Sequence, residues 1–280
     1  MIQKYKVRFP QLTFKRWHPF ILNVLEEDVS KSKAIIKVLE YFGLDKSEAV
    51  AFGDVLITIN HEDFELAKKK MHAKSVCYVP GVGIDLSKIQ SVECDRAEVR
   101  KTMGVPEDCI LLLSIGELNV NKNHQVVIKA LARLNNKNAH YAIAGLGDQK
   151  DNLLNLAKNL GVESQFHLLG YRTDALKLYK AADVFVFPSF REGLSVSMME
   201  AMASGLPVVC SKIRGNVDLV EDCVGGFHFV PNDVDGLTQN LKNIIDDTAK
   251  VVQMGDANKE KIKMFSLKNV LGMMKEIYGL

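Results

Sequence analysis

Val184–Cys210 reads VFVFPSFREGLSVSMMEAMASGLPVVC. It holds an apolar run at Val184–Phe187, a segment at Ser195–Ala203 with apolar residues three and four positions apart, and a second apolar run at Pro207–Cys210. These patterns indicate a strand, an amphipathic helix and a strand. Two strands joined through a helix form a right-handed βαβ unit with parallel strands. The stretch therefore predicts an α/β fold.

The same alternation continues on both sides of this stretch. Four more runs predict strands, at Ile110–Ile115, Tyr141–Ala144, Gln165–Leu169 and Phe227–Val230. Four more segments predict helices, at His124–Leu134, Lys150–Leu160, Ala175–Ala181 and about Ser266–Leu280. Strands and helices in strict alternation predict a doubly wound parallel sheet. Because ligands of such sheets bind beyond the carboxyl ends of the strands, the loops after the strands are the expected site.

Glycine-containing loops follow four of the predicted strands. They are Gly116–Asn123, Gly145–Asp148, Gly170–Arg172 and Pro188–Ser195. Glycine lets a backbone approach a ligand closely, and the free N–H groups at a helix start can receive an anion. Four such loops at one edge of a sheet favour a binding site there.

The last of these loops carries two glutamates, Glu192 and Glu200, with seven residues between them. The helix start beside them would offer N–H groups to phosphates, and a carboxylate at Glu200 can accept two hydroxyls. A nucleoside diphosphate needs both features, for its phosphates and its ribose. A capped helix with a partly solvated glutamate would show the same spacing, so both interpretations stay open at this point.

Composition excludes several classes of protein. With 280 residues, of which 47% are hydrophobic, the chain has enough apolar residues for a core, and its net charge of +2 argues against a dedicated nucleic-acid binder. The five cysteines form no Cys-x-x-Cys pair and the histidines share no metal-ligand spacing, so we expect reduced thiols and no zinc site.

No stretch of 18 or more apolar residues occurs, so we expect a soluble, cytoplasmic protein. Basic residues before position 20 leave two interpretations open, a solvated basic face or contact with the inner face of a membrane.

The chain from about Asp54 to its C-terminus resembles the donor half of retaining GT-B glycosyltransferases of family 4. The E-x7-E spacing of Glu192 and Glu200 carries this resemblance, together with SIGELNVNKNH at 114–124, AIAGLGD at 142–148 and HLLGYRTD at 167–174. The resemblance implies a Rossmann-like sheet and transfer of a hexosyl group from a UDP- or GDP-sugar to a saccharide or lipid-linked acceptor. It implies no cofactor and no obligatory metal.

The resemblance also implies residue roles. Glu192 would face the donor sugar and Lys122 would neutralise the diphosphate, so these two are the expected catalytic residues. The expected donor-binding residues are Gly116, Asn123, Gly145, Gly147, Tyr171, Arg172, Gly193, Leu194, Ser195 and Glu200. In this set the N–H groups of residues 193–195 would bind the phosphates, Glu200 the ribose, and Tyr171 with Arg172 the base. One departure is Glu117, where many members have an arginine that adds a second cation.

Residues 1–53 resemble instead the late part of Cof-type phosphatases of the haloacid dehalogenase superfamily. We expect a helix at about Ser32–Phe42, a stop at Gly43 and a strand at Ala49–Phe52. Lys31 lies at the position that balances the phosphoryl and nucleophile charges in that family, and Asp54 at a position that helps to hold magnesium. However, residues 1–20 contain no aspartate nucleophile, and the magnesium loop continues with Ile57 and Thr58 instead of Asn and Asp. Phosphatase activity is therefore not expected.

Three segments follow from the two resemblances: a haloacid-dehalogenase-like fragment at 1–53, a remnant of the acceptor domain and the crossing segment at 54–95, and a donor-binding domain at 96–280. Because the acceptor half is reduced to about Asp54–Lys70, three interpretations stay open. They are a truncated enzyme, a catalytically silent donor-binding module, and the donor half of an enzyme whose acceptor domain a partner chain supplies.

Overall fold

The computed structural model describes residues 13–18, 21–25, 55–70 and 73–278. The chain separates into two compact units, Met1–Leu56 with Lys70–Val76 and Ile57–Lys69 with Cys77–Leu280. The boundaries expected at residues 53 and 95 stay predictions.

In the first unit, β1 (Thr13–His18) and β2 (Ile21–Leu25) pair antiparallel, with Thr13 opposite Leu25 and an irregularity between Arg16 and His18. The features expected at Lys31, Ser32–Phe42, Gly43, Ala49–Phe52 and Asp54 lie outside the described residues. Farther along, β3 (Val55–Thr58) and β4 (Ser75–Tyr78) form a two-stranded sheet, and α3 (His61–Lys70) lies between them in the sequence. Strand β3 and helix α3 thus lie within Asp54–Lys70, the segment that resembles a remnant of the acceptor domain.

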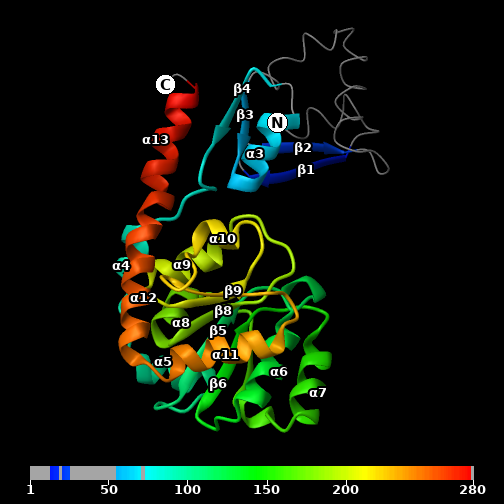
Figure 1. The fold of residues 1–280 in the computed structure, drawn as a ribbon, viewed down its shortest axis with the longest axis vertical. Coiled ribbons are helices and arrows are strands. Elements are labelled where there is room, and N and C mark those ends of the chain that lie inside the picture. The colour runs from blue at the N-terminus through cyan, green and yellow to red at the C-terminus, as the bar shows by residue number, and fades with distance from the viewer. Residues whose placement is uncertain (1–12, 19–20, 26–54, 71–72, 279–280) are drawn as a thin grey trace. The chain divides into compact units, whose positions relative to one another are not determined.

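The second unit is built on a six-stranded parallel sheet (Figure 1). Its strands are β5 (Ile110–Ile115), β6 (Ala139–Ala144), β7 (Phe166–Gly170), β8 (Val184–Phe187), β9 (Val208–Ser211) and β10 (Gly226–Phe229). Their spatial order is β10-β9-β8-β5-β6-β7, and every pair is parallel. The doubly wound parallel sheet is confirmed. Because the chain runs outward from β5 in one direction and from β8 in the other, the switch point lies between these two strands.

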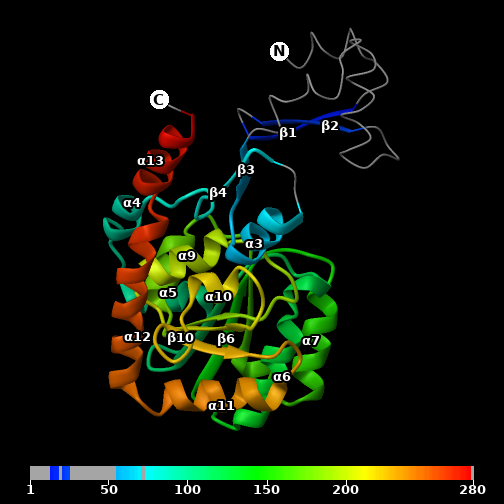
Figure 2. The ribbon, with the colours of Figure 1, turned by 45° about the horizontal axis from the view of Figure 1, so that its top comes forward.

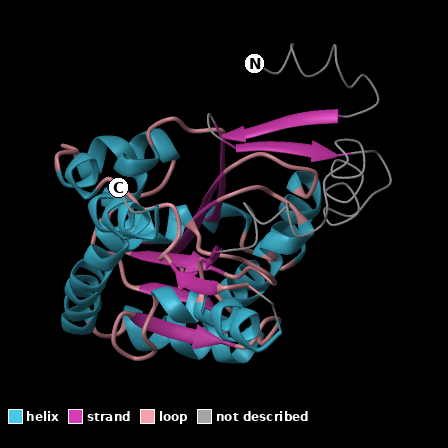
Figure 3. Cartoon of the chain, turned by 90° about the horizontal axis from the view of Figure 1, so that it is seen from above, coloured by secondary structure: helices cyan, strands magenta, loops and turns pink. Residues whose placement is uncertain are grey.

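Helices cover both faces of this sheet, and Figure 3 shows them on either side of the strands. The helices of this part of the chain are α4 (Leu86–Gln90), α5 (Arg96–Met103), α6 (His124–Leu134), α7 (Lys150–Asn159), α8 (Ala175–Ala181), α9 (Val196–Ala203), α10 (Asn216–Leu219), α11 (Val234–Ile245), α12 (Thr248–Lys261) and α13 (Leu267–Tyr278). Three short 3-10 turns complete the unit: η2 (Val120–Lys122), η3 (Glu163–Gln165) and η4 (Ile262–Phe265).

Successive side chains of a strand point to opposite faces of the sheet and pack into two separate hydrophobic cores. In β5, Leu111 and Leu113 belong to the cluster that includes α5, α8 and α9, whereas Leu112 belongs to the cluster that includes α6, α7 and α11. All three leucines are fully buried. Burial on both faces explains why the strands read as continuous apolar runs rather than as alternating ones. Helix α6 lies beside both α7 and α11 (Figure 2).

Several expected boundaries were wrong by one or two residues, each for a local reason. Helix α9 begins at Val196 rather than Ser195, because the Ser195 side chain caps the helix by accepting a hydrogen bond from the N–H of Met198. Strand β7 begins after Gln165, which ends the 3-10 turn η3. Strand β9 begins at Val208 rather than at Pro207, which has no N–H to donate.

The buried Arg100 ties α5 to the start of the sheet. Its guanidinium donates to the carbonyls of Ala181 at 3.0 Å and Cys109 at 2.7 Å, and to Asp183 Oδ2 at 2.7 Å. The same carboxylate oxygen accepts the N–H of Leu111 at 2.7 Å, so one ion pair joins α5, β5 and the loop before β8. The Arg100 side chain is 2% exposed, and Asp183 is 28% exposed.

We predict that Arg100→Met lowers the free energy of unfolding by about 3 kcal/mol, because removing one partner of a buried ion pair typically costs roughly 3–5 kcal/mol. Chemical unfolding followed by far-ultraviolet circular dichroism measures this loss. Arg96 also pairs with Asp183, but its side chain is 46% exposed. Arg96→Met is therefore the matched control, with an expected loss below about 1 kcal/mol. Equal losses in the two variants would contradict a structural role for the buried pair.

Candidate active site

The loops after β5 and β8 meet at the switch point through an ion pair. Lys122 Nζ lies 2.7 Å from Glu192 Oε1, and the two side chains are 18% and 16% exposed. The ammonium also lies 4.8 Å from the centre of the Phe187 ring, which favours a cation at this place. The structure thus brings together the two residues expected to be catalytic.

Asparagines hold the Lys122 loop in position. The side-chain oxygen of Asn119 accepts the N–H of Lys122 at 3.0 Å, which caps the 3-10 turn η2. Asn121 donates from its side chain to the carbonyl of Arg191 at 3.0 Å, and its own carbonyl accepts the N–H of Phe190 at 2.8 Å. The β5 loop is therefore hydrogen-bonded directly to the β8 loop.

The Asn123 side chain is buried and supports the neighbouring loop instead of lying open to a ligand. The residue is 2% exposed and donates from its side chain to the carbonyl of Pro188 at 3.3 Å. Its backbone adopts the left-handed conformation, with φ of 50°, at the junction of η2 and α6. The structure places this expected donor-binding residue beneath the loop that carries Lys122.

A buried hydrogen-bonded group supports the same loop from below. His124 contacts Tyr141 Oη through Nδ1 at 2.8 Å and the carbonyl of Glu117 through Nε2 at 3.3 Å. Burial lowers the pKa of His124 to about 4, so its imidazole is neutral near pH 7. A neutral ring that donates from Nε2 to the Glu117 carbonyl must accept the Tyr141 hydroxyl proton at Nδ1.

Two of the glycines allow the loops after β5 and β6 to touch. A Cβ atom on Gly145 would lie 1.8 Å from the carbonyl oxygen of Gly116, and one on Gly147 would lie 2.3 Å from that of Leu118. No side chain fits at either position without moving backbone. The close approach that these glycines permit is between two loops of the chain itself.

A cavity of about 670 Å³ opens over these loops. Five expected donor-binding residues line it: Gly116, Gly145, Gly147, Tyr171 and Arg172. The Tyr171 side chain is free to move against a ligand, since the residue is 75% exposed. The exposed Glu117 side chain also lines the cavity and accepts the side-chain N–H of Asn119 at 2.8 Å, so a carboxylate occupies the place of the missing arginine.

Arg172 is held by an ion pair inside its own loop. Its Nε and Nη2 donate to the two carboxylate oxygens of Asp174 at 2.8 and 2.7 Å, and Nη2 also donates to Thr102 Oγ1 at 3.1 Å. The hydrogen bonds from Arg172 lower the pKa of Asp174 below its ordinary value. The guanidinium therefore presents a fixed plane at the cavity rather than a free cation.

The start of α9 supplies the unpaired N–H groups expected beside Glu192. Within the described part of the chain, the N–H groups of Gly193, Leu194 and Ser195 donate no hydrogen bond. They precede the first turn of α9, where the helix dipole favours an anion. The ion pair with Glu192 therefore holds the Lys122 cation of the β5 loop against the β8 loop, which carries the three free donors.

Glu200 lies one and a half turns farther along α9, in a second cavity of about 520 Å³. Tyr179 Oη donates to Glu200 Oε2 at 3.2 Å. Burial raises the pKa of the Glu200 carboxyl, an effect that the Tyr179 hydrogen bond and the nearby Lys88 ammonium oppose. Ala175 lines both this cavity and the first one, so the two adjoin there.

Sequence reasoning missed the supporting residues Asn119, Asn121 and Asp174. The signal for Asn119 was an asparagine three residues before Lys122, which is typical of a side-chain cap. Met198, Met199 and Met202 on α9 are all fully buried, so they pack in the core.

Two kinds of feature are absent from residues 13–18, 21–25, 55–70 and 73–278. No three His, Cys, Asp or Glu side chains gather there as metal ligands. No helix in these segments has both the length and the apolar character needed to cross a bilayer.

Comparison with known proteins gives two family matches. The model of the family "Glycosyl transferases group 1" matches residues 95–261. The model of the haloacid dehalogenase-like hydrolases matches residues 1–59, which supports the resemblance of the N-terminal segment.

Two curated relatives illustrate the similarity in sequence. An uncharacterized glycosyltransferase of Methanocaldococcus jannaschii is 31% identical over 188 residues, covering 66% of this chain and 48% of the relative. The UDP-Gal:alpha-D-GlcNAc-diphosphoundecaprenol alpha-1,3-galactosyltransferase of Escherichia coli is 26% identical over 230 residues, covering 80% of this chain and 59% of the relative. The chain thus spans about half of the length of these relatives.

Solved structures show the same fold. Anabaena HepE in complex with UDP has a TM-score of 0.75 at 22% identity, with 83% of this chain and 65% of that chain covered. The C-terminal domain of a glycosyl transferase group 1 family protein from Francisella tularensis has a TM-score of 0.58 at 19% identity, with 65% of this chain and 97% of that domain covered. Because the family match at residues 95–261 takes in more than half of the chain, this protein belongs to the group 1 glycosyltransferases, which have the GT-B fold.

Proposed function

We propose that the switch-point site binds a nucleoside diphosphate sugar and transfers its hexosyl group, with retention of configuration, to a saccharide or lipid-linked acceptor. The observation that carries the proposal is the Lys122–Glu192 pair beside the free N–H groups of Gly193, Leu194 and Ser195. A cation and convergent N–H donors stabilise the negative charge that a departing diphosphate acquires. The family 4 assignment and the residue roles belong to this proposal.

The comparisons favour a uridine nucleotide. The Escherichia coli relative is named for UDP-galactose, and HepE has been solved with UDP and with UDP-glucose. In this chain, Tyr171 and the fixed Arg172 plane would hold the base at the mouth of the larger cavity. Glu200 would accept the ribose hydroxyls after rotating from its contact with Tyr179.

In the proposed reaction, the acceptor hydroxyl attacks the anomeric carbon on the face from which the diphosphate leaves. Its proton passes to the departing diphosphate oxygen as the bond from that oxygen to the anomeric carbon breaks. Lys122 and the N–H groups at residues 193–195 stabilise the diphosphate as its bond to the sugar breaks. Glu192 faces the donor sugar, and its ion pair with Lys122 holds the ammonium at the switch point until the donor binds. Lys122 therefore has to turn from the carboxylate toward the phosphate oxygens when the donor binds.

A second candidate function is a donor-binding module without turnover of its own. The observation that favours it is coverage, since the chain spans 48% and 59% of the two relatives described above. A partner chain that supplies the acceptor domain would convert such a module into an enzyme. A lipid-linked acceptor would place the protein in the cytoplasm at the inner face of a membrane.

We predict that Glu200→Ala weakens UDP binding about tenfold or more, because each hydrogen bond to a charged group is worth roughly 1.5–3 kcal/mol. Isothermal titration calorimetry with UDP, GDP and ADP measures the change and identifies the preferred base. Glu163→Ala is the matched control, since it removes an equally charged but exposed side chain in the turn before β7. Equal UDP affinities in the two variants would contradict the donor-site assignment.

Substitutions of Lys122 and of Glu192 should change the affinity for UDP in opposite directions. Lys122→Ala is expected to weaken UDP binding about tenfold or more, because it removes a charge-assisted contact to phosphate. Glu192→Gln is expected to strengthen UDP binding several-fold, because the lysine is released and the repulsion between carboxylate and diphosphate disappears. Titration of both variants at low and high salt measures this, and a loss of affinity in Glu192→Gln would contradict a competing ion pair.

Turnover separates the enzyme from the silent module. We expect the chain alone to release no UDP from its preferred donor in the presence of a saccharide acceptor, and to release it once a separate acceptor domain is supplied. Coupled detection of free UDP measures the release. Turnover by the chain alone would show that a separate acceptor domain is not required.

A further inference from the structure

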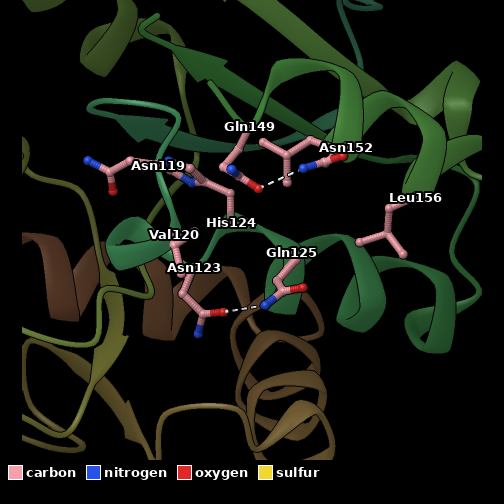
Figure 4. A pocket seen from close by; sticks show the side chains of 9 residues that line it. Asn119, Val120, Asn123, His124, Gln125, Gln149, Asn152 and Leu156 are labelled. Atoms are coloured by element: carbon pink, nitrogen blue, oxygen red, sulfur yellow. Dashed lines mark hydrogen bonds between the residues drawn. The ribbon is translucent and has the colours of Figure 1, made fainter. Parts of the chain in front are cut away.

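A third hollow, of about 210 Å³, opens where α6 and α7 begin (Figure 4). The Lys122 loop forms one wall through Asn119 and Val120, and the other walls come from the first turns of the two helices. Asn119 also lines the larger cavity of the candidate active site, so the two spaces share this residue. The roles proposed above for the donor site leave the hollow without a function.

Carboxamide side chains dominate the lining of the hollow. They come from Asn119, Asn123, Gln125, Gln149 and Asn152. Each carboxamide offers one oxygen that accepts hydrogen bonds and two N–H groups that donate them. A hydroxyl group can also both donate and accept. The lining therefore matches a ligand that is rich in hydroxyl groups.

Two of these carboxamides are oriented by their neighbours while keeping free acceptors. Asn152 donates to Gln149 Oε1 at 3.0 Å, and Gln125 donates to Asn123 Oδ1 at 3.5 Å, as the dashed lines in Figure 4 show. In the described part of the chain, neither the Oδ1 atom of Asn152 nor the Oε1 atom of Gln125 accepts a hydrogen bond. These oxygens are available to a ligand without disturbing the fold.

The hollow carries no ionised side chain. Its one titratable residue is His124, which is buried and whose lowered pKa of about 4 keeps the ring neutral near pH 7. In contrast, Glu117, Asp148 and Arg172 line the larger cavity of the candidate active site. That site also includes the Lys122–Glu192 ion pair. A phosphate or carboxylate would find no cation in the hollow, so its chemistry favours an uncharged ligand.

Apolar surface is also present for the nonpolar face of a ring. Val120 is 65% exposed, and Leu156 points from α7 toward the hollow in Figure 4. The volume of about 210 Å³ is below the roughly 300–1,000 Å³ of pockets for drug-sized ligands, so it suits one ring. Carboxamides around an apolar strip match a pyranose, which has hydroxyls at its edge and C–H groups on its face.

We propose that this hollow is a saccharide subsite that takes one uncharged hexose unit on the α6–α7 side of the Lys122 loop. The subsite goes beyond the donor site proposed above and does not depend on it. A glycan held there would contact the loop that carries Lys122 through Asn119 and Val120.

Saturation-transfer difference NMR on the full chain tests the proposal, with methyl glycosides of glucose, galactose, mannose and N-acetylglucosamine as probes. At least one glycoside should bind with a millimolar Kd. The double variant Gln125→Ala/Asn152→Ala should weaken that binding about tenfold, because each lost hydrogen bond typically costs roughly two- to tenfold in affinity. Asn155→Ala is the matched control: it lies on α7, is exposed, and does not line the hollow. The same thermal unfolding midpoint in all variants establishes that the fold is intact.

Competition separates this subsite from the donor site. Excess UDP should leave the glycoside signal unchanged, whereas displacement by UDP would place the glycoside in the donor cavity and overturn the proposal. Displacement by inorganic phosphate would overturn the assignment of an uncharged ligand. Absence of binding at about 50 mM of every glycoside, or equal binding by the double variant and the control, would also overturn the proposal. If UDP fails to bind at all, only the donor site is contradicted.

Discussion

The switch in strand order between β5 and β8 is the constraint on which the site depends. At this point the connections from neighbouring parallel strands leave in opposite directions, so two loops face each other across an opening that no crossover helix fills. In this protein the loops are joined by hydrogen bonds from Asn121 and Asn123 and by the Lys122–Glu192 ion pair. Two charges this little exposed are tolerated because they face each other. The same pair is therefore both a structural link and a charged group ready to meet a ligand.

The rest of the unit holds these loops at fixed places. Fully buried side chains fix the strands, and the loops start from the carboxyl ends of these strands. The Arg100–Asp183 pair fixes the opposite, amino-terminal end of β5. Near the loop itself, neutral His124 and the hydroxyl of Tyr141 support the Glu117 carbonyl. A polar group buried this deeply has to be fully paired, so this arrangement has little freedom to move. Lys122 can turn toward a ligand while its backbone stays in place.

Much of the fold follows from periodicity because each strand is buried on both faces. Ile110–Ile115 and Val184–Phe187 are strands, and His124–Leu134 and Ala175–Ala181 are helices, with the bounds that the patterns predict. The site was less accessible to such reasoning. Lys122 and Glu192 are 70 positions apart, so their pairing depends on strand order rather than on any local pattern. The Arg172–Asp174 pair also could not be inferred, because a short loop admits many conformations. Glycine was identified correctly as necessary after β6, yet the contact that requires it is with the β5 loop.

We propose that the switch point accepts a nucleoside diphosphate by opening the Lys122–Glu192 pair. A crystal structure of the chain with UDP tests this proposal. We expect diphosphate oxygens within about 3 Å of Lys122 Nζ and of the N–H groups of residues 193–195, with the uracil against Tyr171 and the ion pair lengthened or broken. UDP bound elsewhere, with the ion pair intact and no phosphate oxygen within hydrogen-bonding distance of Lys122, would contradict it.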